Sequence, residues 1–182
     1  MMRVLDIGCG DKTECRTIFP KAKIITLDVN PDLKPDIVAD ITQPLKIDEK
    51  FDTVFMSHVI EHIPRLSVVP TLQNIAQVLN RQGKLYVITP SLEWAARQII
   101  DNEDLHVSVL ASIFGSQDGA WQFHQCGFTI MLLRQAIRMA GMQDMEAYQS
   151  SYTIEMESGP IKAQQNIVVG WKVFEDGEER ES

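Results

Sequence analysis

The sequence predicts an α/β fold of the doubly wound type, in which helices cover both faces of a mostly parallel sheet. Short apolar runs rich in β-branched residues alternate with stretches of helical periodicity, which is the pattern of repeated strand–helix units. The apolar runs are continuous and do not alternate with polar residues, as is typical of strands buried on both faces.

The expected strands take up much of the first half of the chain and return near its end. Five are expected at residues 3–7, 23–28, 36–40, 51–56 and 84–89, and two more near 143–150 and 167–174. One helix follows Pro64 and is expected to stop at Gly83, before the fifth strand. A second is capped by Ser91, and a third is capped by Thr129 and stopped by Gly141. Residues 102–128 are expected to be irregular.

Composition bounds the class of protein. The 182 residues, 45% of them hydrophobic, suffice for one domain, which we place at residues 1–174, followed by a frayed acidic tail at 175–182. The net charge of −8 and the lack of a basic stripe argue against a nucleic-acid partner. Three sparse cysteines, no membrane-length apolar run and no signal-peptide pattern lead us to expect a cytoplasmic protein without a membrane partner.

The first strand ends in a glycine turn, Asp6-Ile7-Gly8-Cys9-Gly10. A dinucleotide-binding turn would have a third glycine at position 13, where this chain has threonine. The acid two residues before Gly8 disfavours a pyrophosphate. It favours a ligand with a cationic end, such as the amino group of S-adenosylmethionine.

Two more acids are expected at the same edge of the sheet. Asp28 ends the second strand, 22 residues after Asp6, where a carboxylate can accept both hydroxyls of a ribose. Asp40 ends the third strand and could accept an adenine amino group. Each acid alone is equally well explained as a helix cap or a local turn. Together they predict one ligand crevice at the carboxyl ends of the strands.

With this set of motifs the sequence resembles the class I S-adenosylmethionine-dependent methyltransferases. The resemblance covers about residues 3–145, and its motifs are VLDIGCG (Val4–Gly10), ITLDVNP (Ile25–Pro31), DIVAD (Asp36–Asp40), FDTVFMSHVIEHIP (Phe51–Pro64) and LNRQGKLYVITPS (Leu79–Ser91). More narrowly, it resembles small bacterial predicted methyltransferases that have a SHVLEHI-type fourth motif and a later FH…GFT segment, here at Phe123–Met142.

The resemblance implies a seven-stranded Rossmann-like sheet with one antiparallel strand, and S-adenosylmethionine as cofactor. It also implies a set of cofactor contacts, namely Asp6, Gly8, Cys9, Gly10, Asp28, Val29, Asn30, Asp40, Ile41, Ser57 and His58. The chain lacks the helices that usually precede the first strand in this family. We therefore expect an open cleft that residues 91–128 or a second subunit, as in a homodimer, would have to cover.

The fourth motif contains His58-x-x-Glu61-His62, which is also the spelling of a zinc-protease motif. Pro64 leaves room for little more than one helical turn, and zinc explains none of the glycines or acids, so we expect no metal. Three roles stay open for these side chains. They could hold the turn by local hydrogen bonds, His62 or His58 could act as a general base, or they could only contact acceptor or cofactor.

The segment 102–128 is expected to form an acceptor-binding lid, with His106, Trp121 and His124 as contacts, although its aromatic residues could equally pack the loop onto the sheet. The predicted function is methyl transfer to a small molecule, on oxygen and with a sugar or polysaccharide precursor as one acceptor class. The alternative is a non-catalytic protein that binds S-adenosylmethionine or S-adenosylhomocysteine as a sensor or assembly partner.

Overall fold

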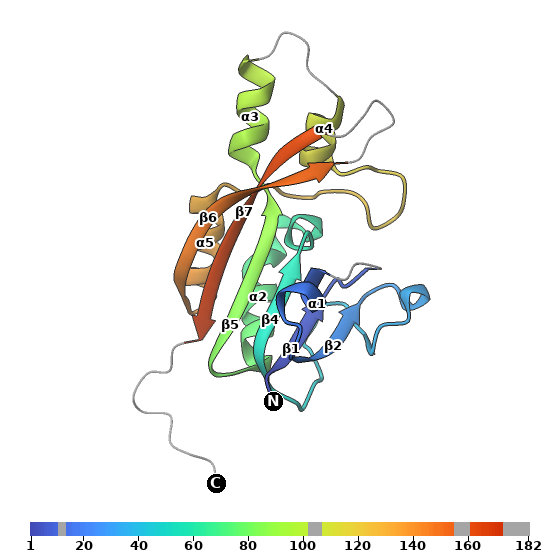
Figure 1. The fold of residues 1–182 in the computed structure, drawn as a ribbon, viewed down its shortest axis with the longest axis vertical. Helices are drawn as coiled ribbons and strands as arrows, with labels where there is room; N and C mark the ends of the chain where they lie inside the picture. The colour runs from blue at the N-terminus through green and yellow to red at the C-terminus, as the bar shows by residue number, and fades with distance from the viewer. Residues whose placement is uncertain (11–13, 102–106, 155–160, 173–182) are drawn as a thin grey trace.

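The computed structural model describes residues 1–10, 14–101, 107–154 and 161–172. Its elements, in chain order, are β1 (Arg3–Ile7), α1 (Glu14–Ile18), β2 (Lys23–Asp28), β3 (Ile37–Val38), β4 (Phe51–Ser57), α2 (Val68–Val78), β5 (Leu79–Pro90), α3 (Leu92–Asp101), α4 (Val107–Phe114), α5 (Ile130–Met139), β6 (Met142–Ile154) and β7 (Ile161–Lys172) (Figure 1).

The seven strands form one sheet in the order β3-β2-β1-β4-β5-β7-β6. The first five run parallel, and β7 is antiparallel to both of its neighbours. This topology confirms the predicted seven-stranded, mostly parallel sheet with one antiparallel strand. Because the parallel strands all end at the same edge, the turns that follow β1, β2 and β4 are brought together there.

Helices lie on both faces of the sheet. Successive residues of β1 point to opposite faces, and each face packs against different helices. Leu5 and Ile7 belong to the larger core cluster, which also contains apolar residues of α2 and α5. Val4 belongs to a smaller cluster with Cys15 of α1. Asp6 shares the face of Val4 and therefore lies on the side of α1.

Some expected elements differ in extent. Gly83 does not stop a helix: α2 ends at Val78 and β5 begins at once, with Leu79 paired to Phe51. The next pair is Thr53 with Lys84, so the residues between Leu79 and Lys84 bulge out of the ladder. The third strand has only two residues, Ile37–Val38.

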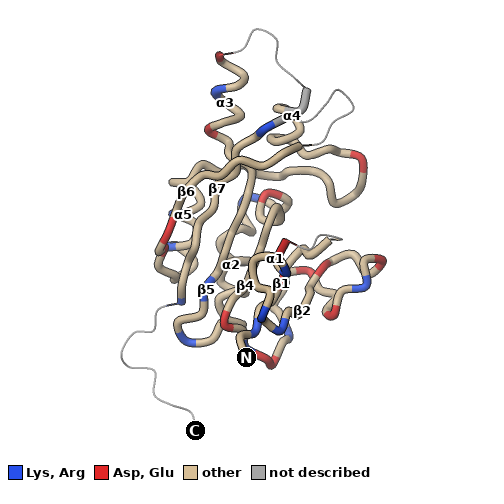
Figure 2. The backbone as a smooth tube through the Cα atoms, viewed as in Figure 1, with Lys and Arg blue, Asp and Glu red and all other residues tan. Residues whose placement is uncertain are grey.

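The last two strands are longer than expected, and α4 forms inside the segment expected to be irregular. Ser91 and Thr129 cap their helices as predicted, accepting hydrogen bonds from the N–H groups of Trp94 and Leu132. The acidic tail at 175–182 lies outside the described residues. Lys and Arg are scattered among Asp and Glu along the backbone (Figure 2). No helix in the described part of the chain is long and apolar enough to cross a membrane.

Candidate active site

A cavity of about 920 Å³ opens at the carboxyl edge of the parallel strands. It brings together most of the residues that the sequence singled out, namely Gly8, Gly10, Asp28, Val29, Asn30, Asp40, Ile41, Ser57, His58, His62, Trp121 and His124. Asp6 and Cys9 do not line it, and His106 lies outside the described residues.

The glycine turn after β1 needs glycine for two separate reasons at Gly8. Its φ is +66°, a left-handed conformation that side chains disfavour. A Cβ there would also lie 2.2 Å from Cγ2 of Val59, which follows β4. Gly10 has a φ of +53°, and both glycines line the cavity.

Asp28 joins this turn to the end of β2. Its carboxylate accepts hydrogen bonds from the N–H of Gly10 at 3.2 Å and from the N–H of Asn30 at 2.9 Å. Each carboxylate oxygen has a second lone pair, so both remain able to accept a ligand hydroxyl. Asp28 therefore stabilises the local turn and can still accept hydrogen bonds from the hydroxyls of a bound ligand.

Asp6 lies beneath the turn and is 7% exposed. Burial raises its pKa to about 6, and the nearby carboxylates of Glu14 and Asp28 act in the same direction. Glu14 was not among the predicted site residues, and its carboxylate accepts a hydrogen bond from the Ser57 hydroxyl at 2.8 Å. Three carboxylates so close together are stabilised by a cationic ligand, which is the chemistry that a sulfonium or ammonium group offers.

Two other predicted contacts have different surroundings. Asp40 is exposed and accepts hydrogen bonds from the N–H and hydroxyl of Thr42, which makes it the centre of a local turn. The thiol of Cys9 is buried, and burial together with Asp28 and Asp6 raises its pKa to about 11. Cys9 is therefore a protonated, weakly reactive packing residue at neutral pH.

The wall after β4 begins with His58, whose φ is +55°. Its Nε2 lies 2.9 Å from Oε1 of Gln165 on β7, and its Nδ1 lies 3.4 Å from Oε1 of Glu61. Its ring lies against that of Tyr152 on β6. Both ring nitrogens of His58 are thus engaged with protein groups.

Glu61 is 2% exposed and is the most buried acid of this wall. Burial by itself raises its pKa, but the neighbouring His58 overrides this and holds the pKa below its usual value. Its Oε2 accepts a hydrogen bond from the hydroxyl of Thr89 at 2.9 Å. Its backbone carbonyl accepts hydrogen bonds from the N–H groups of Gln125 and Cys126, which attach these two residues to the turn.

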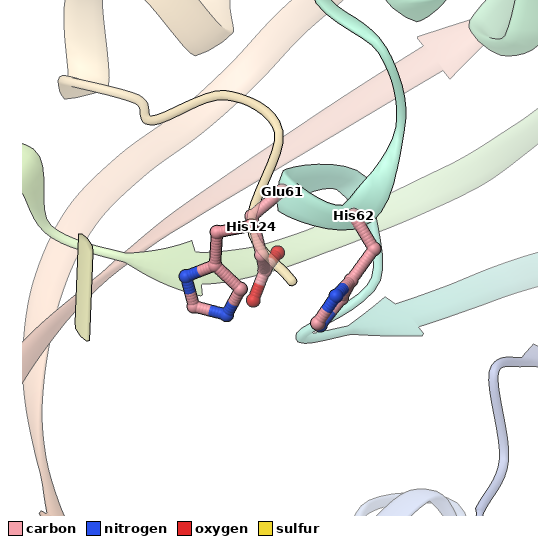
Figure 3. A group of neighbouring side chains, drawn as sticks. All are labelled: Glu61, His62 and His124. Carbon is pink, nitrogen blue, oxygen red and sulfur yellow. The ribbon is translucent and has the colours of Figure 1, made fainter. Parts of the chain in front are cut away.

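His62 and His124 lie edge to face beside Glu61, with ring centroids 4.7 Å apart (Figure 3). His62 Nδ1 lies 3.0 Å from the carbonyl oxygen of Phe123, and His124 Nδ1 lies 3.2 Å from that of Ser112. Burial lowers the pKa of His124, and His62 acts in the same direction while Glu61 opposes it. The sequence named both histidines but gave no sign that they are neighbours.

Trp121 also lines the cavity, but 58% of its surface is exposed. Residues 120–125 and 152–154 also line the cavity.

Comparison with known proteins identifies the family. The family model described as a methyltransferase domain matches residues 1–133. The chain belongs to the methyltransferase family. The match confirms the resemblance to the class I S-adenosylmethionine-dependent methyltransferases, the enzyme class and S-adenosylmethionine as cofactor. No curated protein matches the methyltransferase significantly.

Solved structures share the fold of this methyltransferase. An S-adenosylmethionine-dependent methyltransferase from Methanosarcina mazei is 17% identical with a TM-score of 0.67, and the match covers 95% of this chain and 93% of that one. The N-methyltransferase NodS from Bradyrhizobium japonicum, in complex with S-adenosylhomocysteine, is 14% identical with a TM-score of 0.61, over 94% and 78%. A 1,6-didemethyltoxoflavin N1-methyltransferase from Burkholderia thailandensis is 12% identical with a TM-score of 0.59, over 94% and 71%.

Proposed function

We propose that the protein transfers a methyl group from S-adenosylmethionine to an oxygen atom of a small-molecule acceptor. One observation carries the proposal: a single cavity joins the glycine turn and strand-end acids to a wall that bears two histidines. The cofactor would occupy the first half and the acceptor the second. The boundary between them lies at Ser57, the last residue of β4, and at His58, which follows it.

In this arrangement the backbone of Gly8 and Gly10 allows the cofactor to approach the end of β1. The cluster of Asp6, Glu14 and Asp28 favours its positive charge, and Asp6 does so through its electric field because it does not line the cavity. Asp28 accepts the ribose hydroxyls, with Val29, Asn30, Asp40 and Ile41 around the adenine.

The bound cofactor supplies an activated methyl group, and the protein supplies position and proton control. His62 suits a proton-accepting role, because its Nδ1 faces a carbonyl oxygen and its Nε2 lone pair is left for the cavity. His58 suits it less, because both of its nitrogens already have protein partners. His58 then orients Glu61 and separates the two halves of the cavity.

The exposed indole of Trp121 and the polar histidine wall favour an acceptor with an apolar face and several hydroxyls, such as a sugar. Residues 107–128 serve as the acceptor-binding lid, to which a second copy of the chain could add cover. The charge pattern of Figure 2, which lacks a continuous basic stripe over the described residues, supports a substrate other than nucleic acid. The sparse cysteines support a cytoplasmic location.

Calorimetric titration with S-adenosylhomocysteine tests the cofactor half. We expect Asp28→Asn to weaken binding about 10-fold to 100-fold, since it loses charge-assisted hydrogen bonds. Asp48→Asn is the matched control, because Asp48 is exposed in the loop before β4, at the opposite end of the sheet. Equal affinity in both variants would contradict the placement of the cofactor.

Transfer of tritium from methyl-labelled S-adenosylmethionine to a panel of sugars, phenols and amines tests the reaction. Label in a hydroxyl-bearing acceptor supports oxygen methylation, and label only in amines contradicts it. Tight cofactor binding without transfer to any acceptor or cell extract would favour the non-catalytic role.

A further inference from the structure

We propose that Glu61, His62 and His124 form a binding site for a divalent transition-metal ion, which holds the acceptor through two neighbouring oxygen atoms. The site lies in the acceptor half of the cavity. The inference rests on the proposed function for the role of the ion, but the binding of the ion is argued and tested separately.

The three side chains converge from two parts of the chain (Figure 3). Glu61 and His62 stand in the 3₁₀ turn Ile60–His62, and His124 stands in the segment before α5. One potential ligand atom from each lies within 4.8 Å of the other two. The backbone bonds from Gln125 and Cys126 to the Glu61 carbonyl, and a bond from the Gln125 side chain to the His62 carbonyl at 2.8 Å, hold the two parts in place.

The hydrogen bonds of the two histidines fix which nitrogen of each ring is available. A carbonyl oxygen can only accept, so the Nδ1 atoms of His62 and His124 must carry the hydrogens in their bonds to Phe123 and Ser112. In the neutral rings each Nε2 therefore has a free lone pair. Histidines that bind metals usually have this arrangement, in which the other ring nitrogen donates to a carbonyl or a carboxylate.

Glu61 adds a third acceptor. Its Oε1 is buried and makes no hydrogen bond to the described residues, and its contact with Nδ1 of His58 is an ion-pair distance of 3.4 Å. Buried polar atoms are almost always hydrogen-bonded, so this carboxylate oxygen beside two imidazoles has room for a further partner. This oxygen and the two Nε2 atoms are three acceptors, which suit a cation.

Two imidazole nitrogens and one carboxylate oxygen are a set that zinc and ferrous iron bind with coordination positions left open. This ligand set differs from the one that the zinc-protease motif His58-x-x-Glu61-His62 suggests. His58 is turned toward Gln165 and Glu61, and it is absent from the group of converging ligand atoms. His58 therefore acts as a positioning residue behind Glu61, and His124, which is 62 residues away from His62, takes the third place.

Open positions on the ion would accept two adjacent oxygens of the acceptor, as in a vicinal diol. On binding, the reacting hydroxyl loses its proton to solvent, because a bound cation stabilises the alkoxide. The oxygen then forms a bond to the methyl carbon, and the carbon–sulfur bond of S-adenosylmethionine breaks with its electron pair left on sulfur. The ion thereby replaces His62 as the group that makes the hydroxyl reactive.

Metal binding is tested with the apoprotein by titration with Zn²⁺ in a calorimeter and with Co²⁺ by visible absorption. We expect one equivalent of each to bind and Co²⁺ to show d–d bands of a low-symmetry site. His62→Asn, His124→Asn and Glu61→Gln should each weaken binding about 100-fold or more, since each removes a direct ligand. Glu146→Gln, on the exposed surface of β6, is the control for loss of a carboxylate.

Because Glu61 is buried, Glu61→Gln could fail to fold. If thermal melting shows that it does, the two histidine variants alone test the metal site. Both histidines are only partly buried, and we expect these variants to melt like the parent protein. Binding of less than one equivalent, or equal binding in both histidine variants and the parent, would overturn the metal site. If S-adenosylhomocysteine still binds in that case, the proposed function stands without the metal site. Metal binding without S-adenosylhomocysteine binding would instead support the metal site and contradict the proposed function.

The acceptor class is tested with catechol as a chelating probe and phenol as its non-chelating control. We expect catechol, but not phenol, to shift the Co²⁺ bands of the parent protein. Equal shifts, or none, would contradict chelation of the acceptor.

Discussion

Replacing Asp6 by asparagine should stabilise the protein without cofactor at neutral pH and weaken its binding of cofactor. Asp6 is buried beside Glu14 and Asp28, and burial and these carboxylates raise its pKa from 3.8 to about 6. Above that pKa the folded protein has to hold a charge in a place that disfavours it. Asparagine has nearly the same shape and carries no charge.

The magnitude follows from the pKa. Between about pH 4 and 6 the folded protein keeps a proton on Asp6 that the unfolded chain has lost, so stability falls as the pH rises through this window. The rise from 3.8 to about 6 corresponds to at most ~3 kcal/mol. Solvent screening through the open cavity reduces the expected gain from Asp6→Asn to ~1–2 kcal/mol.

Urea unfolding of the parent and the variant at about pH 4 and about pH 7.5 measures the effect. The two proteins should be equally stable at the lower pH, and the variant should be more stable at the higher one. Asp48→Asn should stay within about 0.5 kcal/mol of the parent at both. A variant no more stable than the parent at about pH 7.5, or a gain that does not change with pH, would refute the reasoning. Affinity for S-adenosylmethionine should fall about tenfold in Asp6→Asn.

Three further changes test other parts of the site. Gly8→Ala should cost ~2–4 kcal/mol of stability in chemical denaturation, since it combines a positive φ with overlap on Val59, and adding Val59→Ala should restore part of it. Thr89→Val should cost ~1–3 kcal/mol in the same assay, because it removes the hydroxyl that bonds Glu61; an unchanged midpoint would be unexpected. Trp121→Ala should leave the melting temperature unchanged and lower kcat/KM for the acceptor about tenfold, because its ring is exposed in the cavity.

Much of the fold could be predicted because local and global signals agree. The runs at Arg3–Ile7 and Lys23–Asp28 are apolar along their length and become adjacent parallel strands. Gly83 misled the prediction because a glycine after a helical pattern usually ends the helix. Here the pairing of Leu79 with Phe51 pulls the chain into β5 five residues earlier, and only the neighbouring strand supplies that pairing. The helix Val107–Phe114 was missed because polar and glycine-rich residues surround it.

The site was predictable where topology alone decides position. The strand-end residues Asp28 and His58 had to meet at one edge once the sheet was parallel. Asp6 was expected to contact the ligand, but the alternation of β1 turns it toward α1, outside the cavity lining. The pairing of His62 with His124 spans 62 residues and leaves no local trace in the sequence.

The attachment of Gln125 and Cys126 to the Glu61 carbonyl has a consequence for protein engineering. The N–H groups of Gln125 and Cys126 hold the far end of the acceptor segment in place through backbone contacts, which do not depend on the side chains at positions 120–123. Positions 120–123 can therefore be randomised to change the acceptor, while the turn that contains Glu61 and His62 keeps its shape. A library for new substrates should vary residues 120–123 and leave 124–126 unchanged.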